Sequence, residues 1–259
     1  MPRLAEFETS QPKDLVMSVG GSVMNDKVDP VHFNCDFIDS FVAFCKRHIK
    51  DKSIVAVVGG GHLARVRIDD MRCTGVKNET RLDQAGIQVT WFNANQLKTI
   101  IDENGIPARS YEFGKPVFAG VVYTRGGDKP GVTTDKVAVD VAIELKAGTV
   151  INIASVPGLY PVNPSGGLDT AKIIPELTFS EYLAMFPGAH KAGENIPFDR
   201  TAAETADKNG ITVILIGENF ENIENCLSGK AFIGTVIRPT PKATETVPAD
   251  VAVSPEPVS

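Results

Sequence analysis

The chain has 259 residues and a formal net charge of −6; 42% of its residues are hydrophobic and 22% are charged. A chain of this length can bury a large hydrophobic core as one α/β unit. The acidic balance argues against nucleic-acid binding through a basic surface, and no apolar run reaches the roughly 18 residues of a membrane span. The amino end lacks the apolar segment of a signal peptide, so we expect a cytoplasmic protein with neither nucleic acid nor membrane as a partner.

Strand-like apolar runs alternate with helical patterns along the chain. A strand is predicted at 15–19 and a helix at 31–49, where Phe37, Phe41 and Phe44 recur at helical spacing. Further strands are predicted at 53–58, 116–122, 149–156, 211–217 and 231–237, and further helices after the glycines at 59–61 and at 81–104, 133–148, 180–186, 197–210 and 218–229. This alternation predicts a mainly parallel sheet covered by helices.

Local sequence signals mark the ends of some of these elements. Thr133 or Thr134 is the expected N-cap of the helix at 133–148, and Gly148 its expected C-cap. After Ile237 the sequence becomes rich in proline and small polar residues, which cannot bury enough apolar surface to become ordered. We therefore expect a single domain at 15–237 between a flexible amino end at 1–14 and a flexible tail at 238–259.

The cysteines carry little functional signal. There are four in a long chain, none of them forms a CxxC pair, and no histidine stands beside them at metal-ligand spacing. A disulfide framework is therefore not expected, and neither is a metal site built from protein ligands.

Glycine-containing loops follow three of the predicted strands, at Gly20–Gly21–Ser22, Gly59–Gly60–Gly61 and Gly126–Gly127. Ligands bind beyond the carboxyl ends of strands in open α/β sheets, and such loops can bring backbone N–H groups to a phosphate. A tight turn explains any one of these loops equally well. The chain contains neither GxxxxGK[ST] nor GxGxxG, which excludes a P-loop and leaves a dinucleotide-binding Rossmann site unsupported.

From about Leu15 to Ile237, the sequence resembles the amino-acid-kinase superfamily, and within it the archaeal-type uridylate (UMP) kinases. The resemblance is carried, in order, by VGGSV (19–23), VVGGGHLAR (57–65), LDQAGIQVTWFNAN (82–95), GGDKPGVTTDKVA (126–138), VPGLYPVNP (156–164), KAGENIPFDRTAA (191–203) and GTVI (234–237). It implies a three-layer α/β/α sandwich with a mainly parallel central sheet, assembled as a hexamer or a related homo-oligomer. It also implies transfer of the γ-phosphoryl group of ATP, with Mg²⁺, to UMP.

The resemblance also implies the acceptor side of the site. Its glycine loop and the arginine that follows would bind the nucleoside monophosphate, and the acceptor residues would be Gly59, Gly60, Gly61, Arg65, Asp83, Asn93, Thr133 and Thr134. A guanidinium suits a phosphate because it can donate two parallel hydrogen bonds. The residues alone leave alternatives open. Arg65 is also explained as a solvated helix residue, Asp83 as a helix cap, Asn93 as a surface residue and Thr133–Asp135 as an ordinary helix start.

The donor side implied by the resemblance comprises Gly20, Gly21, Ser22, Ser155, Tyr160 and Asn163, with Asp135 ordering the phosphate region. This side departs from the family pattern. Ser18 stands where many members have a lysine, and Pro157 and Asn163 replace two aspartates. Lys129 and Lys191 are candidates for the missing positive charge, although both are also explained as surface lysines.

The departures on the donor side keep two alternatives open. The chain could be a kinase of this superfamily for another small acceptor, or a non-catalytic member that binds or stores nucleotides or similar ligands. The HLAR and GIQVTWFNAN matches favour a nucleotide acceptor.

Overall fold

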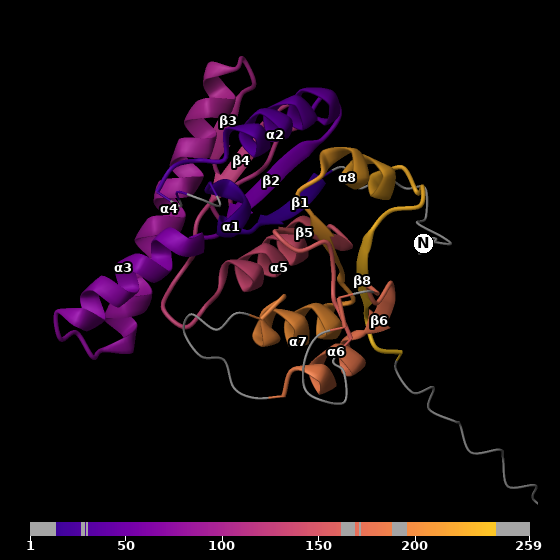
Figure 1. Ribbon diagram of the computed structural model, residues 1–259. Helices are drawn as coiled ribbons and strands as arrows, with labels where there is room; N and C mark the ends of the chain where they lie inside the picture. Colours follow the sequence, from indigo (N-terminus) through magenta and orange to yellow (C-terminus); the bar gives the residue numbers. More distant parts are fainter. Residues whose placement is uncertain are drawn as a thin grey trace, which may run out of the picture.

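One eight-stranded sheet organises the computed structural model, which describes residues 14–26, 29, 31–161, 169–170, 172–187 and 196–241. The strand order is β3-β4-β2-β1-β5-β7-β8-β6 (Figure 1). The strands are β1 (Asp14–Val19), β2 (Ser53–Val58), β3 (Ala108–Ser110), β4 (Val122–Arg125), β5 (Thr149–Ala154), β6 (Glu176–Thr178), β7 (Thr212–Gly217) and β8 (Gly234–Arg238).

The mainly parallel sheet that the sequence predicts is confirmed. Val16 of β1 stands opposite Val55 of β2 on one side and Val150 of β5 on the other, and both pairings are parallel. Only the β7–β8 pair is antiparallel among the described strands. The central strands are buried on both faces, as expected of a parallel sheet covered by helices. Their carboxyl ends therefore meet at one edge of the sheet.

Helices cover both faces of the sheet and complete the three layers. They are α1 (Gly21–Met24), α2 (Cys35–His48), α3 (Gly61–Cys73), α4 (Glu79–Glu103), α5 (Thr134–Leu145), α6 (Phe179–Met185), α7 (Arg200–Asn209) and α8 (Phe220–Leu227). Figure 1 shows α2 and α8 on one side of the sheet and α5, α6 and α7 on the other. Among the described helices, none combines the length and apolar composition needed to cross a membrane.

Two hydrophobic clusters fill the space between the layers. Met17 points into the cluster that holds α2, whereas its neighbour Val16 points into the cluster that holds α5, because successive side chains of a strand alternate between faces. The predicted stripe of Phe37, Phe41 and Phe44 is buried in the first cluster, where all three rings contact Phe220 of α8. These contacts pack α2 against α8 on the same face of the sheet.

Several predicted boundaries are wrong. The strand expected at 116–122 begins only at Val122, because the preceding loop is held by Gly120, whose N–H donates to the carbonyls of Ile49 and Lys52. The strand expected at 231–237 begins at Gly234. The short strands β3 and β6 were not predicted.

The caps of α5 were predicted with mixed success. Thr133 is the N-cap, as one of the two expected alternatives, and its side chain accepts a hydrogen bond from Lys136 N at 3.2 Å. The expected C-cap at Gly148 is wrong. The helix ends at Leu145, and Lys146 adopts the left-handed conformation with a φ of 54°, so that its N–H bonds to the carbonyls of Ala142 and Ile143.

Candidate active site

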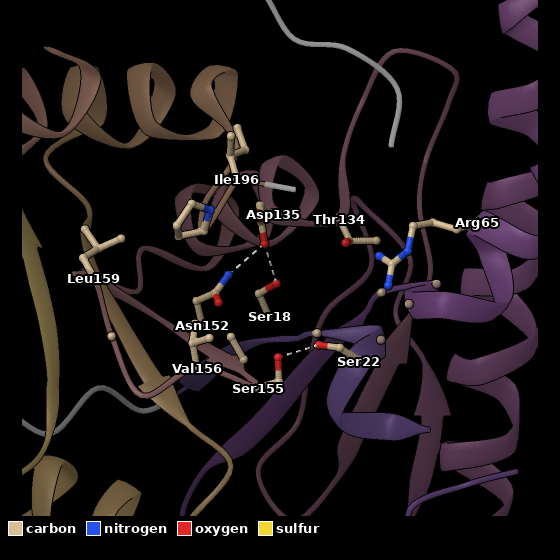
Figure 2. Close-up of a pocket in the computed structure, with 18 of the residues that line it drawn as sticks. Ser18, Ser22, Arg65, Thr134, Asp135, Asn152, Ser155, Val156, Leu159 and Ile196 are labelled. Carbon is tan, nitrogen blue, oxygen red and sulfur yellow. Dashed lines mark hydrogen bonds between the residues drawn. The ribbon is translucent and has the colours of Figure 1, made fainter. Parts of the chain in front are cut away.

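A cavity of about 550 Å³ opens at the carboxyl ends of β1, β2 and β5 (Figure 2). This is the edge at which ligands bind in open α/β sheets. The wall contains residues from the loops after all three strands and from the start of α5. Twelve of its residues were singled out in the sequence: Ser18, Gly20, Gly21, Ser22, Gly59, Gly60, Gly61, Arg65, Thr134, Asp135, Ser155 and Tyr160.

The floor of the cavity is made of two glycine loops in direct contact. Gly59 N donates to the carbonyl of Val19 at 2.8 Å, which joins the loop after β2 to the end of β1. A Cβ atom added to Gly21 would lie 2.0 Å from Gly61 N, and one added to Gly59 would lie 2.8 Å from Gly21 N. Backbone approaches backbone too closely for any side chain, so glycine is required here and the two loops act as one surface.

Helix α3 begins at this floor, with Gly60 as its N-cap and Gly61 as its first residue. Gly60 offers no side-chain oxygen to the first N–H groups of the helix, and those groups carry the positive end of the helix dipole. Arg65 lies one turn further along α3 and lines the same cavity (Figure 2). A guanidinium beside a helix N-terminus is a suitable arrangement for binding a phosphate.

Asn93 supports this loop from behind. It lies on α4, it is fully buried, and its Nδ2 donates to the carbonyl of Gly59 at 2.9 Å. It does not line the cavity. The interpretation of Asn93 as a surface residue is therefore wrong, and its position indicates that it orients the glycine loop.

The opposite part of the wall is the first turn of α5, where Thr134 and Asp135 line the cavity. Ser18 Oγ donates to Asp135 Oδ1 at 2.9 Å, and Asn152 Nδ2 donates to the same oxygen at 2.8 Å (Figure 2). The backbone N–H of Asp199, the N-cap of α7, donates to Oδ2 at 3.2 Å. Three neutral donors from β1, β5 and the α7 cap thus hold one carboxylate.

The pKa of Asp135 is raised to about 6, mainly because burial disfavours the charged form. The nearby carboxylate of Asp199 acts in the same direction, whereas the hydrogen bonds from Ser18, Asn152 and Asp199 oppose the shift. Asp135 is therefore poised to change charge just below neutral pH.

A third part of the wall is the loop after β5. Ser155 and Tyr160 both line the cavity, and Ser22 Oγ donates to Ser155 Oγ at 3.5 Å, so the loop after β1 meets the loop after β5. Apolar side chains continue the wall from this loop toward the segment before α7; they are Val156, Leu159, Phe186, Ile196 and Pro197. This side of the cavity is suited to a flat organic group, whereas the glycine floor is suited to phosphates.

Sequence reasoning missed several of these residues. Asn152 and Asp199 complete the environment of Asp135, and the apolar wall was not foreseen. Asn152 had a detectable signal, because a polar residue interrupts the apolar run of β5. Phe186 had none, since it reaches the cavity only through the packing of α6, whereas Pro197 lies in the KAGENIPFDRTAA motif, which was not assigned to the cavity wall.

Four predicted site residues lie away from the cavity wall. Asp83 on α4 accepts a hydrogen bond from Gly131 N at 2.8 Å and so ties α4 to the loop before α5. Thr133 uses its hydroxyl to cap α5, and Lys129 is exposed on the loop between β4 and α5. Asn93 is the fourth. Lys191 and Asn163 lie outside the described residues.

The third glycine loop has a packing role. Gly127 N donates to Thr90 Oγ1 at 2.7 Å, and Trp91 Nε1 donates to the carbonyl of Gly127 at 2.8 Å. A Cβ atom on Gly126 would lie 2.7 Å from Trp91 N. These two glycines let the loop after β4 pack against α4, and they do not line the cavity. Of the two interpretations left open for this loop, the structure therefore supports the turn and not the phosphate site.

The described residues contain no group of three or more His, Cys, Asp or Glu side chains that could hold a metal ion. Among the described residues that line the cavity, Asp135 is the only one with a carboxylate side chain and Arg65 is the only one with a positively charged side chain.

Comparisons with known proteins show what this chain is similar to. The model of the amino acid kinase family matches residues 13–217. The chain is 34% identical over 232 residues to a uridylate kinase of Natronomonas pharaonis, covering 87% of this chain and 98% of that protein. It is 33% identical over 228 residues to a uridylate kinase of Thermoplasma volcanium, covering 87% of this chain and 97% of that protein.

Solved structures give the same result for the fold. The crystal structure of uridylate kinase from Archaeoglobus fulgidus superimposes with a TM-score of 0.66 at 29% identity, covering 86% of this chain and 100% of that one. The UMP kinase from Bacillus anthracis superimposes with a TM-score of 0.68 at 18% identity, covering 87% of this chain and 96% of that one, and this likeness concerns the fold alone.

Proposed function

The chain belongs to the amino acid kinase family, and we propose that it is a uridylate kinase that transfers the γ-phosphoryl group of ATP to UMP to give UDP. The observation that carries this proposal is that the Gly20–Gly21 loop and the Gly59–Gly61 loop touch and line the same cavity. Two phosphate-binding loops in backbone contact can hold a donor and an acceptor phosphate side by side. The identity to uridylate kinases over most of the chain supports UMP as the acceptor.

The acceptor side is the glycine loop after β2 together with α3. Arg65 would hold the phosphate of UMP through paired hydrogen bonds, and the N-terminus of α3 would add backbone donors. Asn93 and Asp83 would act through the loops that they hold, and Thr133 and Thr134 would orient the start of α5.

The donor side is the wall formed by the loops after β1 and β5. Gly20, Gly21 and Ser22 would approach the phosphates of ATP, while Ser155 and Tyr160 would contact its nucleoside portion. Asn163 would belong to the same side, although it lies outside the described residues.

Phosphoryl transfer requires mainly positioning and positive charge, because there is little covalent chemistry for the protein to perform. The contact between the two loops would set the distance and the line of transfer, and Arg65 would neutralise charge on the acceptor side. Lys129 and Lys191 remain our proposed cations for the transferring group. The apolar wall would exclude water, which could otherwise act as a competing acceptor.

Mg²⁺ accompanies ATP in this proposal and supplies charge neutralisation at the phosphates. In this proposal the ion keeps most of its waters and is held chiefly by the nucleotide. Asp135 is the carboxylate suited to contact the hydrated ion, because it lines the cavity and three neutral donors hold it in place.

We further propose that the chain works as a homo-oligomer, a hexamer or a related assembly, as the resemblance to uridylate kinases implies. Light scattering coupled to size-exclusion chromatography would measure the mass of the assembly directly. A monomeric mass at working concentration would contradict this part of the proposal.

A coupled ADP-release assay tests the activity. The purified full chain is given Mg-ATP with UMP, CMP, dUMP, AMP or small phosphate compounds. We expect turnover with UMP well above that with the other acceptors. Turnover with another acceptor only would reassign the substrate. No turnover across the panel, with nucleotide binding retained in calorimetry, would instead assign a binding or storage role.

A further inference from the structure

Thr235 lies on β8, a strand whose residues do not line the cavity, and its side chain is fully buried. Its hydroxyl accepts a hydrogen bond from Leu159 N at 2.8 Å and donates one to the carbonyl of Ile174 at 2.7 Å. Ile174 N in turn donates to the carbonyl of Leu159 at 2.8 Å. The three residues form a closed ring of hydrogen bonds.

The ring holds a part of the cavity wall. Gly158, Leu159 and Tyr160 all line the cavity. Leu159, which is labelled in Figure 2, is only 1% exposed. The loop lies directly against β8, because a Cβ atom added to Gly158 would be 2.8 Å from Thr235 Oγ1. The hydrogen bonds of Thr235, on the side of the loop that faces away from the cavity, thus hold these wall residues in position.

We propose that Thr235 is a positioning residue for the donor nucleotide, holding the loop 155–160 in the conformation that receives ATP through the hydrogen bonds of its hydroxyl group. The inference rests on the proposed function, in which this loop forms the donor side. It gives a role to the GTVI segment (234–237), which makes no contact with the cavity.

Two backbone groups depend on the Thr235 hydroxyl. Without it, the buried N–H of Leu159 and the part-buried carbonyl of Ile174 each lose a partner, and polar groups without partners away from water are costly. The loop relieves this cost by moving toward water. The sheet itself is less affected, because β7 and β8 pair through their backbones, with Leu215 opposite Thr235.

The effect is expected on one substrate only. The loop after β5 carries the donor side, whereas the acceptor side is built from the loop after β2 and from Arg65 on α3. A displaced donor loop should therefore weaken the binding of ATP and leave the binding of UMP unchanged. A general loss of stability would not separate the two substrates in this way.

The test compares Thr235→Val, which keeps the volume but removes the hydroxyl, with Thr235→Ser, which keeps the hydroxyl. We expect Thr235→Val to raise the KM for ATP about fivefold or more without changing the KM for UMP, and Thr235→Ser to restore the KM for ATP. Thr124→Val is the matched control. Thr124 is a buried threonine of β4 whose Oγ1 has no partner among the described residues, and its replacement should leave both KM values unchanged.

Amide hydrogen exchange supplies a readout that does not depend on activity. In the wild-type protein the Leu159 N–H should exchange slowly, and in Thr235→Val it should exchange much faster. If the wild-type protein does not phosphorylate UMP, the proposed function fails, and the ATP dissociation constant from calorimetry then takes the place of the KM. Equal changes for ATP and UMP, an unchanged ATP affinity in Thr235→Val, or rapid exchange of Leu159 N–H in the wild type would each overturn the role of Thr235. The exchange rate of the Leu159 N–H in the wild-type protein tests the role of Thr235 even if Thr235→Val does not fold.

Discussion

Ser18 and Asp135 are 117 residues apart in the chain, yet the hydroxyl of Ser18 donates a hydrogen bond of 2.9 Å to the carboxylate of Asp135. The contact joins the end of β1 to the first turn of α5 inside the candidate active site. Ser18 stands where, by the resemblance, many members of the family have a lysine. Burial raises the pKa of Asp135, and the hydrogen bond from Ser18 acts against that shift.

The raised pKa of Asp135 predicts a pH-dependent stability. The folded value is about 6, above that of an unfolded aspartate, so the native state binds the proton more tightly. The free energy of unfolding should therefore fall as the pH rises from about 4 to about 6. Across this window we expect the wild type to lose about 2–3 kcal/mol relative to Asp135→Asn. Urea unfolding at several pH values measures the difference, and parallel curves for the two proteins would contradict the prediction.

Arg65→Ala should raise the KM for UMP tenfold or more, since about 1.4 kcal/mol or more of charge-assisted binding is lost. The KM for ATP should change little. Arg67→Ala is the matched control, because Arg67 lies two residues further along α3, its side chain is 64% exposed, and it pairs with Asp70 at 3.7 Å. Steady-state kinetics of both variants decide the matter. An unchanged KM for UMP in Arg65→Ala would mean that the Gly59–Gly61 loop is only a turn and does not bind the phosphate of UMP.

Gly21→Ala should damage the fold at the site. Its Cβ would lie 2.0 Å from Gly61 N, and the backbone there cannot move aside without separating the two loops. We expect a loss of about 1–3 kcal/mol or more in unfolding free energy, together with weaker binding of both substrates. Gly148→Ala is the control, because a Cβ there meets nothing within 4 Å. Thermal unfolding that leaves the two variants equally stable would argue against contact between the loops.

Asn93→Ala tests the support behind the acceptor loop. The buried carbonyl of Gly59 would lose its hydrogen bond, which should cost about 1–3 kcal/mol of stability. The KM for UMP should rise more than the KM for ATP, because Gly59 belongs to the acceptor side. Asn95→Ala, two residues along α4 at an exposed position, is the control and should behave as the wild type. Equal effects on both substrates would mean that Asn93 has only a general structural role.

The two lysines are tested by their effect on turnover. If Lys129 or Lys191 reaches the transferring group when nucleotides bind, replacing it with alanine should lower kcat about tenfold to hundredfold with little change in either KM. Lys77→Ala, at an exposed position between α3 and α4, is the control. An unchanged kcat in the Lys129→Ala, Lys191→Ala double variant would leave Arg65 and the ion carried by ATP as the sources of positive charge.

Local sequence patterns determined much of the scaffold. The strands β1, β2, β5 and β7 can be recognised as apolar runs without any tertiary information. The phenylalanine stripe of α2 can be recognised by its helical spacing. Because parallel strands all end at one edge of the sheet, the sequence also placed the Gly20–Gly21 and Gly59–Gly61 loops at that edge, and the strand order made them neighbours. The role of Arg65 was implied by the family resemblance, since the residues alone also allowed a solvated helix position.

Only the tertiary structure distinguished between residues of the same type. Gly59 faces the cavity while Gly126 packs against Trp91, although both follow buried strands and both are glycines. The short strands β3 and β6 have too few residues to show an alternation of apolar and polar side chains. They lie at the two edges of the sheet, where β3 pairs with β4 and β6 pairs with β8. The hydrogen bonds from Ser18 and Asp199 to Asp135, and those of Thr235, join segments more than sixty residues apart. Such contacts leave no local pattern, because their partners become neighbours only after the layers have packed.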